Sequence, residues 1–299
     1  IGSNKVKEYY GNGEKFDAKF TYIKQDSPRG IAHAISLCKD FVNDEKFLVF
    51  LGDNIIQRDI NQYVSDFKKS NSFASLLLCE VKNPSQFGVA EVKNNKIIKI
   101  TEKPKIPASN LAVTGIYLLT PYIFEVIKKL KPSWRDELEI ADALQILIEE
   151  GKEINYGMIT DFWKDTGTPN DIIEANKFLL EKMQESFKGK KEESTILEGK
   201  VMIGKGTIIK GGVKIVGPTI IGQNCIIEKN SIIGQNTSIG DNSHITESTI
   251  SNSIIMSNCI VKGKINIINS IIASNSKIIQ NQENREKSFL LGEGTQISI

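Results

Sequence analysis

The sequence predicts two domains, an α/β domain followed by a repetitive all-β domain. Two features of the 299 residues support this prediction. Up to about residue 180, apolar runs of strand length alternate with stretches in which apolar residues have helical spacing. From Leu197 onward, isoleucine or leucine recurs at every sixth position, a stride that fits neither a helix nor a simple two-residue alternation.

The first domain is expected to contain a sheet with helices between its strands. The expected strands are residues 20–23, 47–51, 75–79, 97–100, 112–119 and 155–159, and the expected helices are residues 30–41, 60–69, 123–130, 141–149 and 171–187. Residues 47–51 are apolar at every position, which is typical of a parallel strand covered on both faces. Ligands of such sheets bind beyond the carboxyl ends of the strands, where Asp53 falls.

The second domain has a six-residue repeat. The stride runs unbroken through Leu197, Ile203, Ile209, Ile215, Ile221, Ile227, Ile233, Ile239 and Ile245. The fourth residue after the isoleucines is small or compact, namely Thr207, Val213, Thr219, Cys225, Ser231, Thr237 and Ser243. Several isoleucines of the stride are directly followed by a glycine that suits a tight corner, namely Gly204, Gly222, Gly234 and Gly240. After a shift of phase the stride restarts, and we expect it to run through Ile255, Val261, Ile267, Ala273 and Ile279.

This pattern resembles the hexapeptide repeat of left-handed β-helices, in which three hexads form one triangular coil. The handedness follows from the resemblance and not from the period. The domains are therefore expected at residues 1–180 and 195–299, with the polar stretch 181–194 as a linker. Residues 289–299 are expected to form a closing strand pair around Gly292-Glu293-Gly294.

Composition excludes several classes of protein. The net charge is +2 with both signs interspersed, so we expect no nucleic-acid partner. No apolar run has the length of a membrane span and no signal peptide opens the chain, so we expect no membrane partner and a cytoplasmic location. The four cysteines lie far apart and only two histidines are present, which argues against a zinc site and favours reduced thiols.

Three short segments place charged side chains where predicted strands end: 51–54 with Asp53, 101–104 with Glu102 and Lys103, and 163–168 with Asp165. Carboxylates hold a hard cation such as Mg²⁺, and a lysine neutralises phosphate charge. Each segment alone has an ordinary structural explanation. Asp53 suits a turn, Glu102 and Lys103 suit a solvated charge pair, and residues 165–169 suit the approach to a helix N-terminus.

Seven segments together resemble the sugar-phosphate nucleotidylyltransferases, most closely the long glucose-1-phosphate thymidylyltransferases that end in a left-handed β-helix. The segments are residues 22–25 with 28–34, 51–55, 87–91, 102–105, 112–117, 137–143 and 163–168, and residues 237–242 and 252–255 of the tail also match. The resemblance implies a Rossmann-like nucleotidyltransferase domain of the GT-A-like type, incomplete at its N-terminus, before the β-helix.

The resemblance also implies roles for four charged residues. Asp53 and Asp165 would hold Mg²⁺ on the nucleotide phosphates, and Lys103 and Arg135 would clamp the sugar phosphate. The implied reaction is an in-line attack by the sugar-phosphate oxygen on the α-phosphorus of dTTP, which expels pyrophosphate. Its partners would be dTTP, or UTP, and glucose 1-phosphate, and most of the catalysis would come from positioning and charge neutralisation.

Five further residues would bind the substrates according to the same resemblance. Glu102 would accept hydrogen bonds from sugar hydroxyls, with the backbones of Gly88 and Val113 nearby. Gln25 and Gly30 would read the edge of the pyrimidine, where glycine allows a close backbone approach.

The family also has a glycine-rich phosphate loop with an arginine and a downstream lysine, near the start of its domain. This loop does not occur in residues 1–299, whose first residue is isoleucine and not methionine. The native start is therefore expected upstream. The chain as written is expected to catalyse poorly, and its central sheet is expected to have an open edge or gap.

Three alternatives stay open at this stage. The nucleotide could be UTP or another triphosphate, because discrimination on one methyl group is worth only about 1–3 kcal/mol. The chain could be a regulatory or scaffold subunit without catalysis, or a bifunctional transferase whose solenoid uses His244 in acyl transfer. A homo-oligomer is expected, either a trimer through the β-helix or a pair through the catalytic domains. His33 is interpreted as packed or capping, and Trp134 as a brace for the Arg135 loop.

Overall fold

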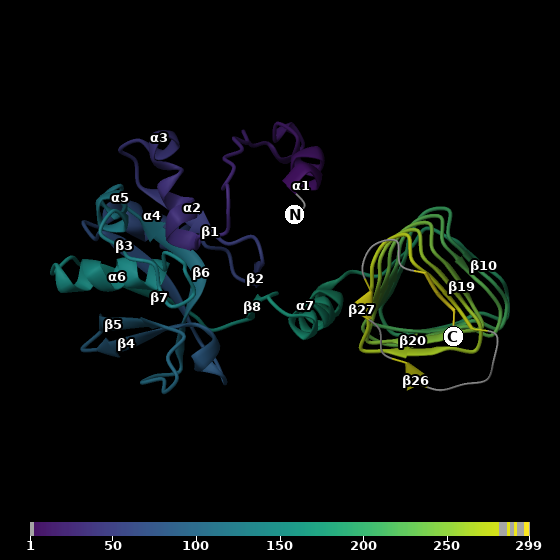
Figure 1. The fold of residues 1–299 in the computed structure, drawn as a ribbon. Helices are drawn as coiled ribbons and strands as arrows, with labels where there is room; N and C mark the ends of the chain where they lie inside the picture. Colours follow the sequence, from purple (N-terminus) through teal and green to yellow (C-terminus); the bar gives the residue numbers. More distant parts are fainter. Residues whose placement is uncertain (1–2, 281–285, 288–289, 292–295, 299) are drawn as a thin grey trace. The chain divides into compact units, whose positions relative to one another are not determined.

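The computed structural model describes residues 3–280, 286–287, 290–291 and 296–298 (Figure 1). The chain divides into two compact units, Ile1–Trp163 and Lys164–Ile299. The first unit is an α/β domain and the second is a parallel β-solenoid that begins with one helix. In the described part of the chain, no helix is both long and apolar enough to cross a membrane.

The first unit is built on one mixed sheet, in the order β5-β4-β6-β3-β7, with β1 paired to β6. Its strands are β1 (Phe47–Phe50), β3 (Ala74–Glu80), β4 (Gly88–Lys93), β5 (Lys96–Glu102), β6 (Leu111–Leu119) and β7 (Ile154–Ile159), and the short strand β2 (Asn54–Ile56) lies outside this sheet. The short strand β8 (Trp163–Asp165) contains the division between the two units. The helices are α1 (Ser3–Tyr10), α2 (Ile31–Ser36), α3 (Lys39–Val42), α4 (Asn61–Lys69), α5 (Tyr122–Ile127) and α6 (Ile140–Glu149), with single 3₁₀ turns at Glu14–Phe16 and Pro84–Gln86. Helix α6 lies against β5, and α2, α5 and α6 contact one another (Figure 1).

Strand β3 is buried on both faces, and its alternating residues belong to two different apolar clusters. Leu76 and Leu78 pack in the larger cluster, which also contains Leu144 of α6. Leu77 and Cys79 pack in a second cluster on the opposite face, with Tyr63 against it. Successive strand residues point to opposite faces, so a run without polar residues indicates a strand covered on both sides. Each such leucine contributes about 1.5–3 kcal/mol by leaving water.

Strand β1 differs from its prediction in both direction and burial. It pairs with β6 in antiparallel register, Phe47 opposite Leu119, and not in parallel. Phe47 stacks on Phe124 at 5.6 Å, whereas Leu48 and Phe50 are 39% and 41% exposed. Among the described strands β6 is the one neighbour of β1, so the other edge of β1 is open there, as the sequence predicts. The all-apolar run therefore predicted a strand correctly here, but it did not predict that the strand is covered on only one face.

Most of the other predicted elements are present, with four differences. Residues 20–23 form no strand, and the predicted helix 30–41 is two short helices, α2 and α3. Strand β4 was not predicted, although it pairs with β5 along its whole length. The helix predicted at 171–187 is α7 (Pro169–Lys182), which starts earlier at a Thr168–Asp171 capping box and ends five residues sooner. The capping box confirms the expected helix N-terminus at this segment.

The second unit contains three parallel sheets whose strands follow one another in turn, which makes a parallel β-solenoid, consistent with the predicted left-handed β-helix. The first sheet contains β10 (Lys190–Lys191), β13 (Ile208–Ile209), β16 (Ile226–Ile227), β19 (His244–Thr246), β22 (Ile260–Lys262), β25 (Lys277–Ile279) and β28 (Gln296–Ser298). The second contains β11 (Ile196–Glu198), β14 (Lys214–Val216), β17 (Ile232–Ile233), β20 (Thr249–Ser251), β23 (Asn266–Ile268) and β26 (Glu286–Lys287). The third contains β9 (Ser186–Phe187), β12 (Val201–Ile203), β15 (Thr219–Ile221), β18 (Thr237–Ile239), β21 (Ile254–Ile255), β24 (Ile271–Ile272) and β27 (Leu290–Leu291).

The coils shorten along the solenoid, which corrects the predicted phase shift. Ile227 stacks on Ile245 eighteen residues later, but Ile245 stacks on Val261 after only sixteen. From Ile245 to Ile250 and from Ile250 to Ile255 the core residues are five positions apart instead of six. The predicted six-residue stride therefore misses the core residue Ile250. A third five-residue step makes Ile272 a core residue, followed by Ile278. The predicted Ala273 and Ile279 each lie one position beyond the core and are only partly buried.

The corners depend on asparagine more than on glycine. A residue with left-handed φ precedes the small buried residue at these corners, most often asparagine: Asn224, Asn230, Asn236, Asn242, Asn252, Asn258, Asn269 and Asn275. Asparagine tolerates this region better than other residues with a side chain, because its short amide bonds locally. The predicted corner glycines have a different role. A Cβ on Gly204 would lie 2.5 Å from the backbone of Gly222 on the next coil.

Solenoid pairing begins and ends differently from the sequence-based expectation. Strands β9 and β10 lie inside the stretch expected to be a linker, and they pair with β12 and β13. The expected closing strand pair is wrong, because β27 and β28 belong to different sheets and extend β24 and β25. Gly292-Glu293-Gly294 lie outside the described residues. Helix α7 packs on the third sheet, where Ser238 Oγ donates to Asn176 Oδ1 at 2.6 Å.

Candidate functional site

Asp53 lies in the turn that follows β1, next to a buried asparagine. The side-chain nitrogen of Asn54 donates to Asp53 Oδ1 at 2.9 Å. Asn54 Oδ1 in turn accepts from the Gly115 amide at 3.3 Å and from Trp163 Nε1 at 2.7 Å. A Cβ on Gly115 would lie 2.5 Å from Asn54 Nδ2, so this glycine makes room for the asparagine. The turn is thereby fixed against β6, and the carboxylate of Asp53 with it.

Glu102 ends β5 beside two of the other predicted residues. It lies opposite Gly88 in the β4–β5 register, and a Cβ on Gly88 would be 3.3 Å from Glu102 Oε2 and 3.8 Å from Val113 Cβ. Lys103 follows in the left-handed region at φ 40°, with its amide bonded to Phe87 O at 3.0 Å. Its side chain is exposed, and among the described residues no carboxylate lies within 4.0 Å of its ammonium. Glu102, Gly88 and Val113 therefore share one surface, with a solvated lysine at its margin.

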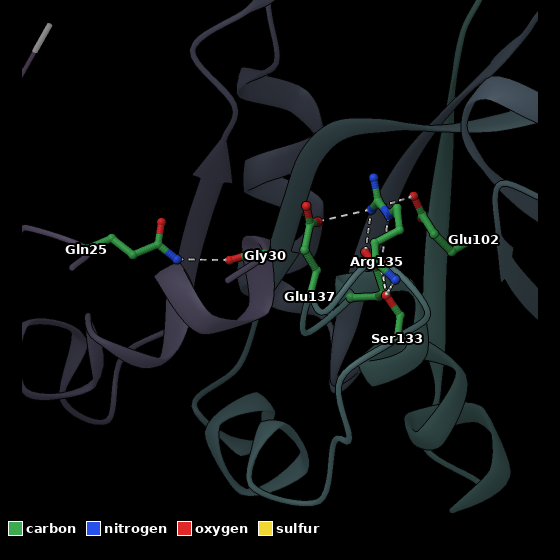
Figure 2. A network of polar contacts seen from close by, with 7 residues as sticks. Gln25, Gly30, Glu102, Ser133, Arg135 and Glu137 are labelled. Atoms are coloured by element: carbon green, nitrogen blue, oxygen red, sulfur yellow. Dashed lines mark hydrogen bonds and ion pairs between the residues drawn. The ribbon is translucent and has the colours of Figure 1, made fainter. Parts of the chain in front are cut away.

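Arg135 is held by a group of carboxylates (Figure 2). Its Nε and Nη2 atoms donate to the two oxygens of Glu139 at 3.0 and 2.8 Å. Nη2 also lies 3.2 Å from Glu137 and 3.5 Å from Glu102. The turn before Glu139 aims the guanidinium at Glu102, since the Arg135 amide donates to Ser133 Oγ and that hydroxyl donates to Glu139 at 2.7 Å. Among the described residues nothing bonds Nη1, which leaves two N–H groups for an anion.

The crowding of carboxylates shifts their pKa values in opposite directions. Burial, followed by repulsion from Glu139, raises the pKa of Glu102 against the attraction of Arg135 and Lys103. Burial also acts to raise the pKa of Glu139, but hydrogen bonds from Arg135 and Ser133 outweigh it and the pKa lies below its usual value. Tyr117 is buried, and burial together with the charges of Glu102 and Asp53 raises its pKa. The pKa of Glu139 is therefore lowered beside Arg135, whereas the pKa of Glu102 is raised, so Glu102 is the more easily protonated partner.

Gln25 and Gly30 lie together, as the predicted base site requires. Gln25 Nε2 is 3.3 Å from Gly30 O (Figure 2). It is also 2.8 Å from Nδ1 of His33, a residue interpreted from the sequence as packed or capping. Gly30 has φ 92°, and a Cβ there would lie 2.5 Å from Leu138 O, so both the conformation and the space require glycine. Leu138 lies between the two glutamates that hold Arg135 and bonds Arg29 O through its amide at 2.9 Å.

Asp165, the other predicted metal ligand, belongs to the second unit, so its pairing with Asp53 stays a prediction. Lys164 beside it binds Asp171 at 2.6 Å and Glu174 at 2.8 Å on α7. Within the described ranges, no group of three or more His, Cys, Asp or Glu side chains is arranged to hold a metal ion. A pair of aspartates that shares Mg²⁺ with substrate phosphates needs no such group, and carboxylate oxygens are ligands that suit this ion.

Sequence reasoning did not assign a role to Glu139 or Glu137, although both lie in a segment that carried the resemblance. The available signal was the run of acidic residues after Arg135. Trp134 does not brace the loop, because its side chain is 86% exposed. His244 lies on the outward row of β19, with Nε2 3.4 Å from Glu228, between Ile226 and Ile260 on the neighbouring coils.

The fold and these residues agree with a family comparison. The model of the nucleotidyl transferase family matches residues 2–182, and the model of the GMPPB C-terminal domain matches residues 215–298. The first match covers more than half of the chain, so the chain belongs to the nucleotidyl transferase family. This confirms the resemblance that the seven segments carry.

Of three similar relatives, two have names that state a nucleotidyl transfer. A glucose-1-phosphate thymidylyltransferase of Streptomyces antibioticus is 39% identical over 222 residues, which are 74% of this chain and 62% of the relative. The low-salt glycan biosynthesis nucleotidyltransferase Agl11 of Haloferax volcanii is 39% identical over 67% of this chain and 56% of its own length. The bifunctional protein GlmU of Methanocaldococcus jannaschii is 39% identical over 68% of this chain and 47% of its own length. The chain thus spans 47% to 62% of the length of these three relatives.

A solved structure is similar to more than half of the chain. It is a Bacillus anthracis protein that has been assigned provisionally as a glucose-1-phosphate thymidylyltransferase and was solved in complex with sucrose. The TM-score is 0.57 at 42% identity, and the match covers 62% of this chain and 74% of the other. Fold and family are thereby established, and the family acts on nucleoside triphosphates and sugar 1-phosphates.

Proposed function

We propose that the protein transfers a thymidylyl group from dTTP to glucose 1-phosphate, which gives dTDP-glucose and pyrophosphate. One observation carries this proposal. In a nucleotidyl transferase fold, Arg135 and Glu102 converge beside Gly88, so an anion binder and a hydroxyl acceptor adjoin a surface that lacks a side chain. A sugar phosphate needs this pair of groups. Relatives named for the same reaction support the choice of substrates.

The proposed roles follow from the chemistry of each group. Arg135 would bind the phosphate of glucose 1-phosphate through Nη1 while Glu139 retains its other edge, and the exposed Lys103 would add a second positive charge. Glu102 would accept hydrogen bonds from sugar hydroxyls, with the backbones of Gly88 and Val113 beside the ring. These contacts would hold a phosphate oxygen in line with the α-phosphorus of the nucleotide, because positioning is the main task in phosphoryl chemistry.

The bond changes are simple. A new bond forms between the sugar-phosphate oxygen and the α-phosphorus, and the bond from the α-phosphorus to the bridging oxygen of the β-phosphate breaks. Pyrophosphate leaves with that electron pair. Asp53 and Asp165 are the residues that would hold Mg²⁺, which would neutralise charge on the phosphates. Gln25 and Gly30 would bind the edge of the base.

The test is pyrophosphate release by the full-length protein with glucose 1-phosphate, Mg²⁺ and each of dTTP, UTP, CTP and GTP. We expect the highest kcat/KM with dTTP, and loss of turnover when EDTA removes the metal. Asp53→Asn should lower kcat at least about 100-fold, because it halves the carboxylate charge at the metal, whereas the exposed Asp44→Asn should match wild type.

The alternatives left open by the sequence correspond to other outcomes of this test. Turnover that is greatest with UTP, or with an amino-sugar phosphate in place of glucose 1-phosphate, would make the protein a nucleotidyltransferase of another specificity. Binding of nucleotides without turnover in any combination would favour a non-catalytic subunit. Light scattering of the same preparation would show whether the protein forms the expected homo-oligomer.

A further inference from the structure

The side-chain amide of Gln25 is fixed through its nitrogen by two groups on one side. Nε2 lies 3.3 Å from Gly30 O and 2.8 Å from His33 Nδ1. A backbone carbonyl can only accept, so the NH₂ end of the amide must face Gly30. The same NH₂ group then donates to His33, whose Nδ1 must carry a lone pair. The imidazole proton is therefore on Nε2.

The two groups that bind this amide are themselves rigid. Arg29 O accepts from the Leu138 amide at 2.9 Å, and the Ala32 amide donates to Leu138 O at 3.2 Å. These bonds bracket Gly30, which has no space for a side chain, and Ala32 is fully buried. His33 follows on α2, anchored by this frame. The amide of Gln25 thus has one orientation that satisfies both acceptors.

The carbonyl end of Gln25 points the other way. Its Oε1 atom has no hydrogen-bond partner in the described part of the chain, and Figure 2 shows it turned away from Gly30. Gln25 lines a surface cavity of about 530 Å³, together with Tyr22, Lys24 and Asp26. A ligand that approaches this end of Gln25 meets the acceptor of its amide.

We propose that His33 is a positioning residue that fixes Gln25 as a hydrogen-bond acceptor, so that the site selects nucleobases with an imide N–H and rejects cytosine. Thymine and uracil carry a hydrogen on N3, which Gln25 Oε1 can accept, whereas N3 of cytosine is itself an acceptor and would face a second lone pair. This inference rests on the proposed function, because it assigns the cavity beside Gln25 to the base of the nucleotide. Its chemistry concerns only the choice among pyrimidines.

The test compares dTTP with dCTP, which have the same sugar and triphosphate. His33→Leu removes the acceptor and frees the amide to rotate, while His33→Asn keeps an acceptor near the position of Nδ1. We expect His33→Leu to raise KM for dTTP about three- to tenfold, as for loss of one hydrogen bond, with kcat within about twofold of wild type. KM for dCTP should fall or stay the same, so the preference for dTTP shrinks. His33→Asn should retain most of the preference, and His244→Asn on the solenoid is the matched control.

Two further measurements separate this inference from the proposed function. Dissociation constants of dTTP and dCTP, measured by calorimetry, give the same comparison without turnover. The imidazole nitrogens of the wild-type protein are readily assigned by NMR, since the chain has only two histidines, and the Nε2–H tautomer is expected for His33. The NMR measurement uses only the wild-type protein, so its result does not depend on whether a variant folds.

Three results would overturn the inference. One is an unchanged ratio of dTTP to dCTP in His33→Leu, by kinetics or by binding. Another is equal loss in His33→Leu and His33→Asn, which would indicate a packing role. The third is an Nδ1–H tautomer for His33. If the protein turns over dTTP and one of these three results is found, the inference fails and the proposed function stands. If the protein binds dTTP in preference to dCTP but shows no turnover, the proposed reaction fails and the inference stands.

Discussion

Arg135 shows how single residues carry the candidate site. Its guanidinium meets three carboxylates, yet only Glu139 binds it through two parallel hydrogen bonds, and Glu139 is the most buried of the three at 6% exposed. A bidentate pair fixes the plane of the guanidinium as well as its place. Arg135 is therefore oriented by Glu139, whereas Glu102 and Glu137 each make a single longer contact with its guanidinium.

Glu139→Gln tests this orientation. The variant replaces a carboxylate that takes two charge-assisted hydrogen bonds, so we expect the free energy of unfolding to fall by about 1–3 kcal/mol. Urea denaturation is the measurement. Glu137→Gln is the matched control, because Glu137 is 32% exposed and makes a single contact at 3.2 Å, and its effect should be within about 0.5 kcal/mol. Equal losses in both variants would contradict the special role of Glu139.

Glu102 gives a pH dependence with a definite sign. The folded state raises its pKa above the ordinary 4.5, so the folded chain binds this proton more tightly than the unfolded chain. The contribution of Glu102 to stability is fully present below pH 4.5 and declines as pH rises through its folded pKa. Glu102→Gln cannot ionise, so its unfolding free energy should fall less than that of wild type as pH rises toward about 8.

Glu139→Gln supplies the opposite sign for comparison. The pKa of Glu139 is lowered, so its stabilisation is present above the ordinary 4.5 and is lost as pH falls through its folded pKa. Urea unfolding at a series of pH values measures both variants. A steeper decline in Glu102→Gln than in wild type on the alkaline side would count against the burial of this carboxylate.

The sequence predicted that Glu102 and Arg135 lie close together, but it did not predict the contacts that hold Arg135. Glu102 and Arg135 were both expected at the sugar phosphate, and the structure brings them together. The hydrogen bonds that Arg135 donates to Glu139 depend on the turn at Ser133, in which Asp136 takes φ 59°. No periodic pattern in a sequence reveals a turn that folds the chain back on itself. His33 lies on a helix of six residues, which is too short for a spacing rule to say which face meets Gln25.

At the scale of elements, regular packing was predictable and local exceptions were not. The isoleucine stride located the solenoid core because a β-solenoid repeats one environment in every coil. It failed after Ile245, where shorter corners changed the count of residues between core positions. The direction of β1 was missed for a related reason, since apolar content reports burial and carries no information about which strand is the neighbour.

Adjacent isoleucines of β16 test the assignment of solenoid faces. Ile227 is fully buried, whereas Ile226 points outward and is partly exposed. Ile227→Ala should lower the free energy of unfolding by about 2–5 kcal/mol, because it leaves a cavity between stacked coils. Ile226→Ala should cost no more than about 1 kcal/mol. A larger loss at Ile226 would mean that the strand register is reversed.

At the scale of the whole molecule, the two units have separate apolar cores. One contains Leu144 of α6 and the strands around it, and the other contains the stacked isoleucines of the solenoid. No residue belongs to both clusters among those described. Domains with their own cores can unfold in separate steps.

We therefore expect two transitions in differential scanning calorimetry. Leu144→Ala should lower the midpoint of one transition and Ile227→Ala the midpoint of the other, since each leaves a cavity in one core only. The pair of variants is matched because both residues are fully buried aliphatic side chains. A single transition that both variants shift by the same amount would show that the units unfold together.

The corners of the solenoid also bear on how such a sequence can change over time. In an ordinary strand, losing one residue turns every later side chain to the opposite face. Here the sides of the coils that are one residue shorter, as before Ile250 and Ile272, return the next isoleucine to the same interior column. A deletion of one residue thus shortens one side of one coil of the solenoid, and the following coils keep their strand register. Homologous solenoids can drift in length while conserving their interior, so structural columns align them better than residue counts do.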